Sequence, residues 1–178
     1  KMTAPRYQDV PSTEIPEVID DDGTRVKVIV GEFWGRRGPV DGIAADPQYL
    51  DIFVPAGVRK TLKVETERHA FAYIFEGSGS FRDASKPFGV RVEKEVNSEE
   101  LHLRDLSGNR TLVQFDRGDE VTVQAGDTGI RFLLVSGKPL KEPVAWHGPI
   151  VMNTGDELRE AIRDLQNGTF IKAQPEGI

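Results

Sequence analysis

Short runs in which apolar and polar residues alternate make up most of the chain, and they predict strands. In the run from 25 to 33, Val26, Val28 and Val30 fall on one face. Further short runs of this kind cover residues 49–54, 89–93, 100–104, 110–115 and 120–124. Many short strands separated by turn residues predict an all-β sandwich or barrel rather than alternating strands and helices.

The stretch from 55 to 77 has the strongest pattern. A proline and glycine turn precedes one strand-like run, the polar residues 66–69 follow, and a second apolar run ends at Gly77. This order predicts a β-hairpin closed within the stretch. The glycine-rich residues 76–80 are interpreted as a hairpin turn, because they open no helix that could bind a phosphate.

One helix is predicted, near the C-terminus. Thr154 and Glu157 have the spacing of a capping box, and Gly168 stands where the helix should stop. A single apolar stripe lies between them, formed by Leu158, Ala161, Ile162 and Leu165. At helical spacing these residues share one face, so the stripe is expected to dock on another apolar surface.

Composition narrows the function. The 178 residues carry a net charge of -6 with no dense basic run, which argues against direct nucleic-acid binding. The chain has no cysteine, which excludes a disulfide framework and cysteine-bound zinc. Because no apolar run is long enough to span a bilayer, no membrane association is expected, and a cytoplasmic location is the expectation.

The glycine spacing resembles the two motifs of cupin barrels, in which two histidines and a glutamate hold a metal ion. Aligned on the glycines of the 55–77 stretch, the histidine positions fall on Lys63 and Glu65, and the glutamate position falls on Ala70. In the partner stretch 118–137, the last histidine position falls on Gly129. The pattern therefore predicts a cupin-type jelly-roll barrel without metal ligands.

Lys63 and Glu65 lie two residues apart and would share a strand face. In the cupin frame this face is the barrel interior, where the two could act as an acid and base pair or simply pair with each other. In the other register both side chains would stay in water. The solvated interpretation is preferred.

Two other functions stay open. His69, His102 and His147 are far apart in sequence, but they could converge with Glu65 on a metal and make the barrel an autonomous enzyme. Alternatively, a metal-free barrel could bind a small molecule or carbohydrate at its mouth. Trp34 and Trp146 are expected to serve packing or an interface.

Three segments resemble the pirin family. The C-terminal signature of pirins is similar to the run from Ser136 to Thr154, SGKPLKEPVAWHGPIVMNT, together with the helix expected after it. Pro5 to Asp9, with Ile15 and Pro16, is similar to the segment that joins the two pirin domains, and residues 73–81 also resemble the family. The similarity extends over nearly the whole chain.

Pirins contain two cupin barrels, and the N-terminal one carries the histidine and glutamate ligands for iron. The resemblance implies that this chain is the C-terminal barrel with its interdomain linker, and that the iron-binding N-terminal domain is absent from it. No pirin metal ligand falls on any position of the chain. Quercetin 2,3-dioxygenase activity or transcriptional co-regulation would belong to the intact protein.

The expected organisation is therefore a linker over residues 1–23, a cupin barrel over 24–153, and a helix with its tail over 154–178. The chain is expected to have no catalytic residue or cofactor and to brace the N-terminal cupin half of the same protein, with self-association as a further possibility. The residues expected at that interface are Trp146, Ile150, Met152, Leu158, Ile162 and Leu165.

Overall fold

The structure, a computed structural model, describes residues 1, 3, 6–81, 87–92 and 107–171. The chain forms two compact units, Val10–Pro139 and a smaller one that combines Lys1–Asp9 with Leu140–Ile178. A short 3-10 turn and the first strand lie in the segment expected to be an extended linker. The sequence-based division at residues 23 and 153 stays a prediction.

The larger unit is built from strands, as the alternating pattern predicts. Its elements are η1 (Ser12–Glu14), β1 (Glu17–Ile19), β2 (Arg25–Val30), β3 (Glu32–Phe33), β4 (Arg36–Arg37), β5 (Gln48–Val54), β6 (Arg59–Lys63), β7 (His69–Ser80), β8 (Pro87–Val92), β9 (Ser107–Gly108), β10 (Thr111–Phe115) and β11 (Glu120–Gly137). The strand predicted at 100–104 lies outside the described residues.

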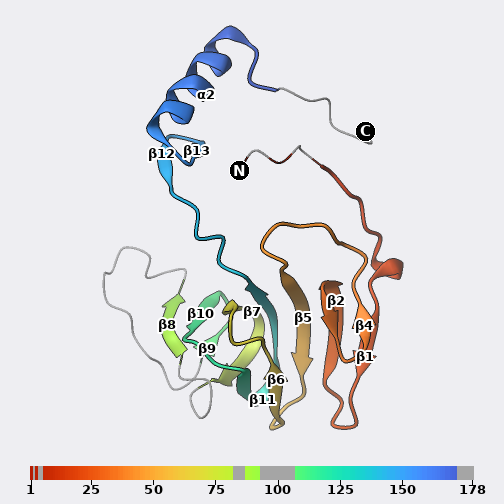
Figure 1. The fold of residues 1–178 in the computed structure, drawn as a ribbon. Coiled ribbons are helices and arrows are strands. Elements are labelled where there is room, and N and C mark those ends of the chain that lie inside the picture. The colour runs from red at the N-terminus through yellow and green to blue at the C-terminus, as the bar shows by residue number, and fades with distance from the viewer. Residues whose placement is uncertain (2, 4–5, 82–86, 93–106, 172–178) are drawn as a thin grey trace. The chain divides into compact units, whose positions relative to one another are not determined.

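The main sheet follows the order β1-β2-β5-β11-β7-β10-β8, and β6 and β9 pair with β11 and β7 beside this path. The long strand β11 pairs with β6 at one end and with β5 and β7 at the other, so it connects two parts of this sheet (Figure 1). Its first part, Glu120–Gln124, pairs with β6, and its last part, from Ile130 to Ser136, lies between β5 and β7. The register shifts between Ala125 and Ile130, so one strand contributes to both parts of the sheet.

The prediction of a β-hairpin within residues 55–77 is wrong. Strands β6 and β7 do form there, but in the described ladders each pairs with β11 and not with the other. After β6, the Val64 N–H donates to the Asp119 carbonyl at 2.9 Å, which holds this end of the strand on β11. The sequence pattern predicted the two strands correctly, but it did not predict that both pair with β11.

The glycine-rich segment that was predicted to be a hairpin turn is part of a strand instead. Residues 76–80 continue β7, and Gly77 lies inside the strand with a φ of 69°. A Cβ atom at Gly77 would lie 2.1 Å from the Gly129 carbonyl oxygen. Glycine is therefore needed here for the close approach of β7 and β11, together with its left-handed backbone.

The core of this unit consists of aliphatic and phenylalanine side chains from the inward faces of the strands. Val26, Val28 and Val30 are buried, which confirms the face predicted for the first strand. Phe132 is fully buried and meets the Phe81 ring edge to face at a centroid distance of 5.5 Å. The other core residues with no exposed surface are Leu50, Ile52, Val54, Leu62, Ala72, Ile74, Val113 and Val123.

The smaller unit contains the hairpin of β12 (Ala145–His147) and β13 (Ile150–Met152), followed by α2 (Gly155–Asn167). The predicted capping box is confirmed: the Glu157 N–H donates to Thr154 Oγ1, and Glu157 Oε2 accepts from the Thr154 N–H. Gly168 ends the helix in the left-handed conformation, with φ at 72°.

Thr154→Ala is expected to weaken the start of α2 by about 1 kcal/mol, because Ala cannot accept the Glu157 N–H. In hydrogen exchange, amides of the first turn of α2 should then exchange about fivefold faster. Thr154→Ser keeps the hydroxyl group and should leave the rates nearly unchanged. Equal exchange in the Ala and Ser variants would show that the capping box does not hold this helix end.

Candidate functional site

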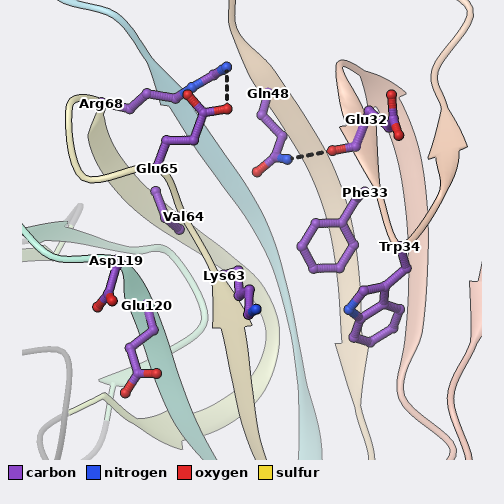
Figure 2. Close-up of a pocket in the computed structure, with 10 residues that line it drawn as sticks. All are labelled: Glu32, Phe33, Trp34, Gln48, Lys63, Val64, Glu65, Arg68, Asp119 and Glu120. Atoms are coloured by element: carbon purple, nitrogen blue, oxygen red, sulfur yellow. Dashed lines mark hydrogen bonds and ion pairs between the residues drawn. The ribbon is translucent and has the colours of Figure 1, made fainter.

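A pocket of about 460 Å³ opens in the larger unit, where several strands begin or end (Figure 2). Strand β3 and its following turn form one wall, and the end of β6, the connection after it and the start of β11 form the other. The residues around it are Glu32, Phe33, Trp34, Gln48, Lys63, Val64, Glu65, Arg68, Asp119 and Glu120.

Aromatic and aliphatic side chains form the apolar part of this pocket. Phe33 and Val64 are buried, whereas Trp34 is 40% exposed and tilts against Phe33 at a centroid distance of 4.8 Å. Trp34 has a φ of 44°, a conformation that a bulky residue adopts at a cost of about 1 kcal/mol or more. The Lys60 ammonium lies 5.0 Å from the Trp34 ring centroid and helps to hold it in place.

Arg68 fixes the connection between β6 and β7. Its guanidinium bonds Asp46 Oδ2 and Glu65 Oε1, both at 3.0 Å, and Lys138 bonds the same Asp46 oxygen at 2.9 Å. The hydrogen bond from Lys138, followed by the charge of Arg68, lowers the pKa of Asp46. Arg68 and Glu65 are thus engaged with neighbouring groups.

The other charged groups of the pocket are not engaged in this way. Lys63 and Glu120 are directly opposite each other in the β6 and β11 ladder, yet no ion pair joins them in the described structure. Figure 2 shows the Lys63 side chain between Glu120 and the two aromatic rings. Asp119 and Glu32 likewise have carboxylates without an ion pair among the described residues. The Gln48 amide donates to the Glu32 carbonyl at 2.8 Å.

The cupin frame places Lys63 and Glu65 on the wrong face. Both are exposed, in agreement with the solvated interpretation, and the buried positions of this segment are Lys60, Leu62 and Val64. The register is therefore one residue away from the one that the cupin frame implies. The side chains of Leu62 and Val64 carry no donor atoms, and the Lys60 ammonium is paired with Asp20 and Asp22, so these three positions offer no metal ligand.

The residues at the two other ligand positions of the cupin motifs cannot bind a metal ion either. Ala70 is half-buried and packs against the core, and Gly129 lies in the irregular part of β11 with a φ of 78°. Iron, which the resemblance implies for the intact protein, does not fit the donor set at these positions.

The histidines of the enzyme hypothesis lie on separate elements where the structure describes them. His69 begins β7 and is exposed, whereas His147 ends β12 in the other compact unit. His102 lies outside the described residues. Across the described ranges, no group of three or more histidine, aspartate or glutamate residues could hold a metal ion.

The six interface candidates divide into two groups. Ile150 and Met152 are buried against Ala161, and Leu158 and Ile162 pack on the same cluster, so the predicted stripe docks mainly on β13. Trp146 and Leu165 are 73% and 56% exposed. The Trp146 indole N–H donates to the Gly148 carbonyl at 2.6 Å, which orients the exposed ring.

Sequence reasoning missed Lys60. This buried residue forms ion pairs with Asp20 and, at 2.7 Å, with Asp22, both from the turn before β2. Asp20 and Asp22 belong to an acidic run in the sequence, but no local pattern indicates that their partner lies forty residues later.

None of the helices in the described ranges is both long and apolar enough to cross a membrane.

In the described part of the chain, the antiparallel strands, their hydrocarbon core and the C-terminal helix define a cupin-type barrel protein. Residues 49–171 match the family model of the pirin C-terminal cupin domain. The chain therefore belongs to the pirin family.

Relatives in the family include a pirin-like protein of Caulobacter vibrioides, 39% identical over 171 residues, with 96% of this chain and 54% of the relative covered. Pirin of Mus musculus is 31% identical over 167 residues, with 94% and 51% covered. A crystal structure of quercetin 2,3-dioxygenase from Acinetobacter baumannii has a TM-score of 0.71 and 26% identity, covering 92% of this chain and 50% of that one. The chain spans about half the length of these relatives.

Proposed function

We propose that this chain is the non-catalytic C-terminal cupin domain of a pirin-like protein and that it braces a metal-bearing N-terminal cupin. The family match supports the first part of the proposal, and the relatives, which are about twice as long, support the second. The intact protein would be an iron-dependent enzyme similar to quercetin 2,3-dioxygenase, as the name of the Acinetobacter relative suggests, or a transcriptional co-regulator.

The hydrocarbon interior of the barrel is the observation that carries the proposal. The inward residues of β6 and β7 include Leu62, Ala72 and Ile74, and those of β11 include Phe132 and Leu134. These side chains fill the interior and offer no atom for metal binding or proton transfer. A barrel of this kind contributes stability and surface, and the chemistry is assigned to the other half.

The exposed surface of the smaller unit suits binding to a partner. Trp146, Val151 and Leu165 are exposed, while the hydrophobic cluster of β13 and α2 supports the backbone from which they extend. Large aromatic side chains on a rigid support often dominate the affinity of protein interfaces. We therefore assign Trp146 and Leu165 to the contact with the N-terminal half.

The outer face of the main sheet offers a second apolar surface. Val135 of β11 is directly opposite Tyr49 of β5 and Phe71 of β7, so the three side chains form one row. Phe71 is exposed, and the other two are half-buried. Outward sheet positions exposed to water are usually polar, so this row also supports a role in association.

The proposal predicts a stable complex with the separately produced N-terminal cupin half. The two halves should co-elute in gel filtration at micromolar concentration. Trp146→Ala should weaken the complex at least about tenfold in calorimetry, because it removes a large side chain of the interface. Ile19→Ala, which truncates an exposed residue at the edge strand β1, should have no such effect. Absence of any complex between the unmodified halves would overturn the proposed function.

A further inference from the structure

The pocket around Trp34 has features that a bracing role does not require. We propose that it binds a neutral polyhydroxylated small molecule of monosaccharide size, which rests on Trp34 and is held through its hydroxyl groups by Lys63 and the carboxylates of the opposite wall. The inference uses only this pocket of the larger unit. It is therefore independent of whether the smaller unit binds an N-terminal half.

The size and walls of the pocket favour a small organic molecule. Its volume of about 460 Å³ falls within the range of small-molecule sites, roughly 300 to 1,000 Å³. Phe33 and Val64 form a buried apolar base, and part of the Trp34 ring is exposed beside it. A sugar ring has an apolar face made of its C–H groups, and that face gains from burial against an aromatic ring.

The polar groups of the pocket call for a ligand that both donates and accepts hydrogen bonds. The Lys63 ammonium can only donate, whereas the carboxylates of Asp119 and Glu120 can only accept. None of these three takes part in an ion pair among the described residues. A hydroxyl group can accept from Lys63 and donate to a carboxylate, so a molecule with several hydroxyl groups satisfies both kinds of group.

The net charge of the pocket argues against an anionic ligand. Three carboxylates line the pocket, from Glu65, Asp119 and Glu120, whereas Lys63 and Arg68 are its two cations and the Glu32 carboxylate points away from Lys63 (Figure 2). Arg68 is already neutralised by Asp46 and Glu65. An acidic sugar would face this excess of negative charge, whereas a neutral polyol would not.

Tryptophan fluorescence provides a direct test. The chain contains two tryptophans, so in a Trp146→Phe background Trp34 is the only one. Titration with glucose, galactose or myo-inositol should give a saturable change in its emission, with a dissociation constant of about 1 mM for at least one of them. Glucuronate should bind at least about tenfold more weakly than glucose, because of the negative charge of the pocket.

Two substitutions test the residues of the site. Lys63→Met in the same background should weaken binding of the neutral probe about tenfold, whereas Lys27→Met on β2, outside this pocket, should not. Trp34→Phe should also weaken binding of the neutral probe, as measured by calorimetry. Far-UV circular dichroism should show that the fold of this variant is unchanged.

Three results would overturn the inference. The first is no saturable signal from any neutral probe up to about 100 mM, a limit that excludes all but the weakest binding. The second is binding of glucosamine or spermidine in preference to glucose, which would assign the pocket to organic cations. The third is equal binding by the Lys63→Met variant, which would place the probe elsewhere. None of these results bears on complex formation with the N-terminal half.

Discussion

Replacing Phe132 with alanine is expected to lower the free energy of unfolding by about 3–5 kcal/mol, the largest effect of any substitution considered for this chain. Phe132 is fully buried, and its two ladder partners, Ile52 and Ile74, are buried as well. The Phe81 ring packs against it in a T-shaped contact. Removing the ring would leave a cavity that these neighbours cannot close, because the strands that carry them are fixed by ladders on both sides.

Urea unfolding followed by circular dichroism measures this effect. Phe71→Ala is the matched control, because it removes the same ring from β7, where the side chain points outward and is exposed. It should cost less than about 1 kcal/mol in the isolated chain. If the two alanine variants lose the same stability, Phe132 is not at the centre of the core.

The contrast between the helix and the strands shows what local sequence can determine. The capping box and stop of α2 depend on residues within one or two turns, so Thr154, Glu157 and Gly168 were sufficient to predict both helix ends. Strand pairing depends on residues far away in sequence. Strand β6 pairs with β11, almost sixty residues later, and no pattern within the 55–77 stretch carries that information.

The glycine motif explains the errors at the candidate site. The spacing from Gly57 to Gly77 indicated the right kind of barrel, but the cupin frame drawn from it places Lys63 inward, whereas Lys63 is exposed, as the solvated interpretation has it. A shift of one residue exchanges the two faces of a strand completely. The pocket was therefore not predicted, because its walls come from β3, β6 and β11, and only their pairing brings Trp34, Lys63 and Glu120 together.

Lys60→Met is expected to lower the free energy of unfolding by about 2 kcal/mol. Lys60 is buried and bonds the carboxylates of Asp20 and Asp22, which would be left facing each other without a cation. The loss is smaller than for a fully buried pair, because both aspartates keep part of their surface in water. Lys63→Met, an exposed position on the same strand, should change stability by less than about 0.5 kcal/mol.

The pH dependence of stability tests the same cluster. Hydrogen bonds from Lys60 and from the Asp21 backbone lower the pKa of Asp20. Burial acts to raise the pKa of Asp22, but the hydrogen bonds from Lys60 and Thr24 outweigh it, so this pKa is lowered too. The unfolded chain therefore binds protons first on acidification. The contribution of the cluster is complete above the unfolded aspartate pKa of about 3.9 and is lost as the pH falls through the folded values.

At alkaline pH, Lys60 makes stability depend on pH in the opposite direction, because its pKa is raised in the folded state. Burial acts to lower the pKa of Lys60, but its bonds to Asp20 and Asp22 outweigh this and raise it. Its contribution is complete below the unfolded lysine pKa of about 10.4 and is lost as the pH rises through the higher folded value. The stability difference between the unmodified chain and Lys60→Met should thus stay constant from about pH 5 to 9 and shrink below about pH 4. A difference that did not change down to pH 2 would show that the ion pairs with Asp20 and Asp22 do not stabilise the fold.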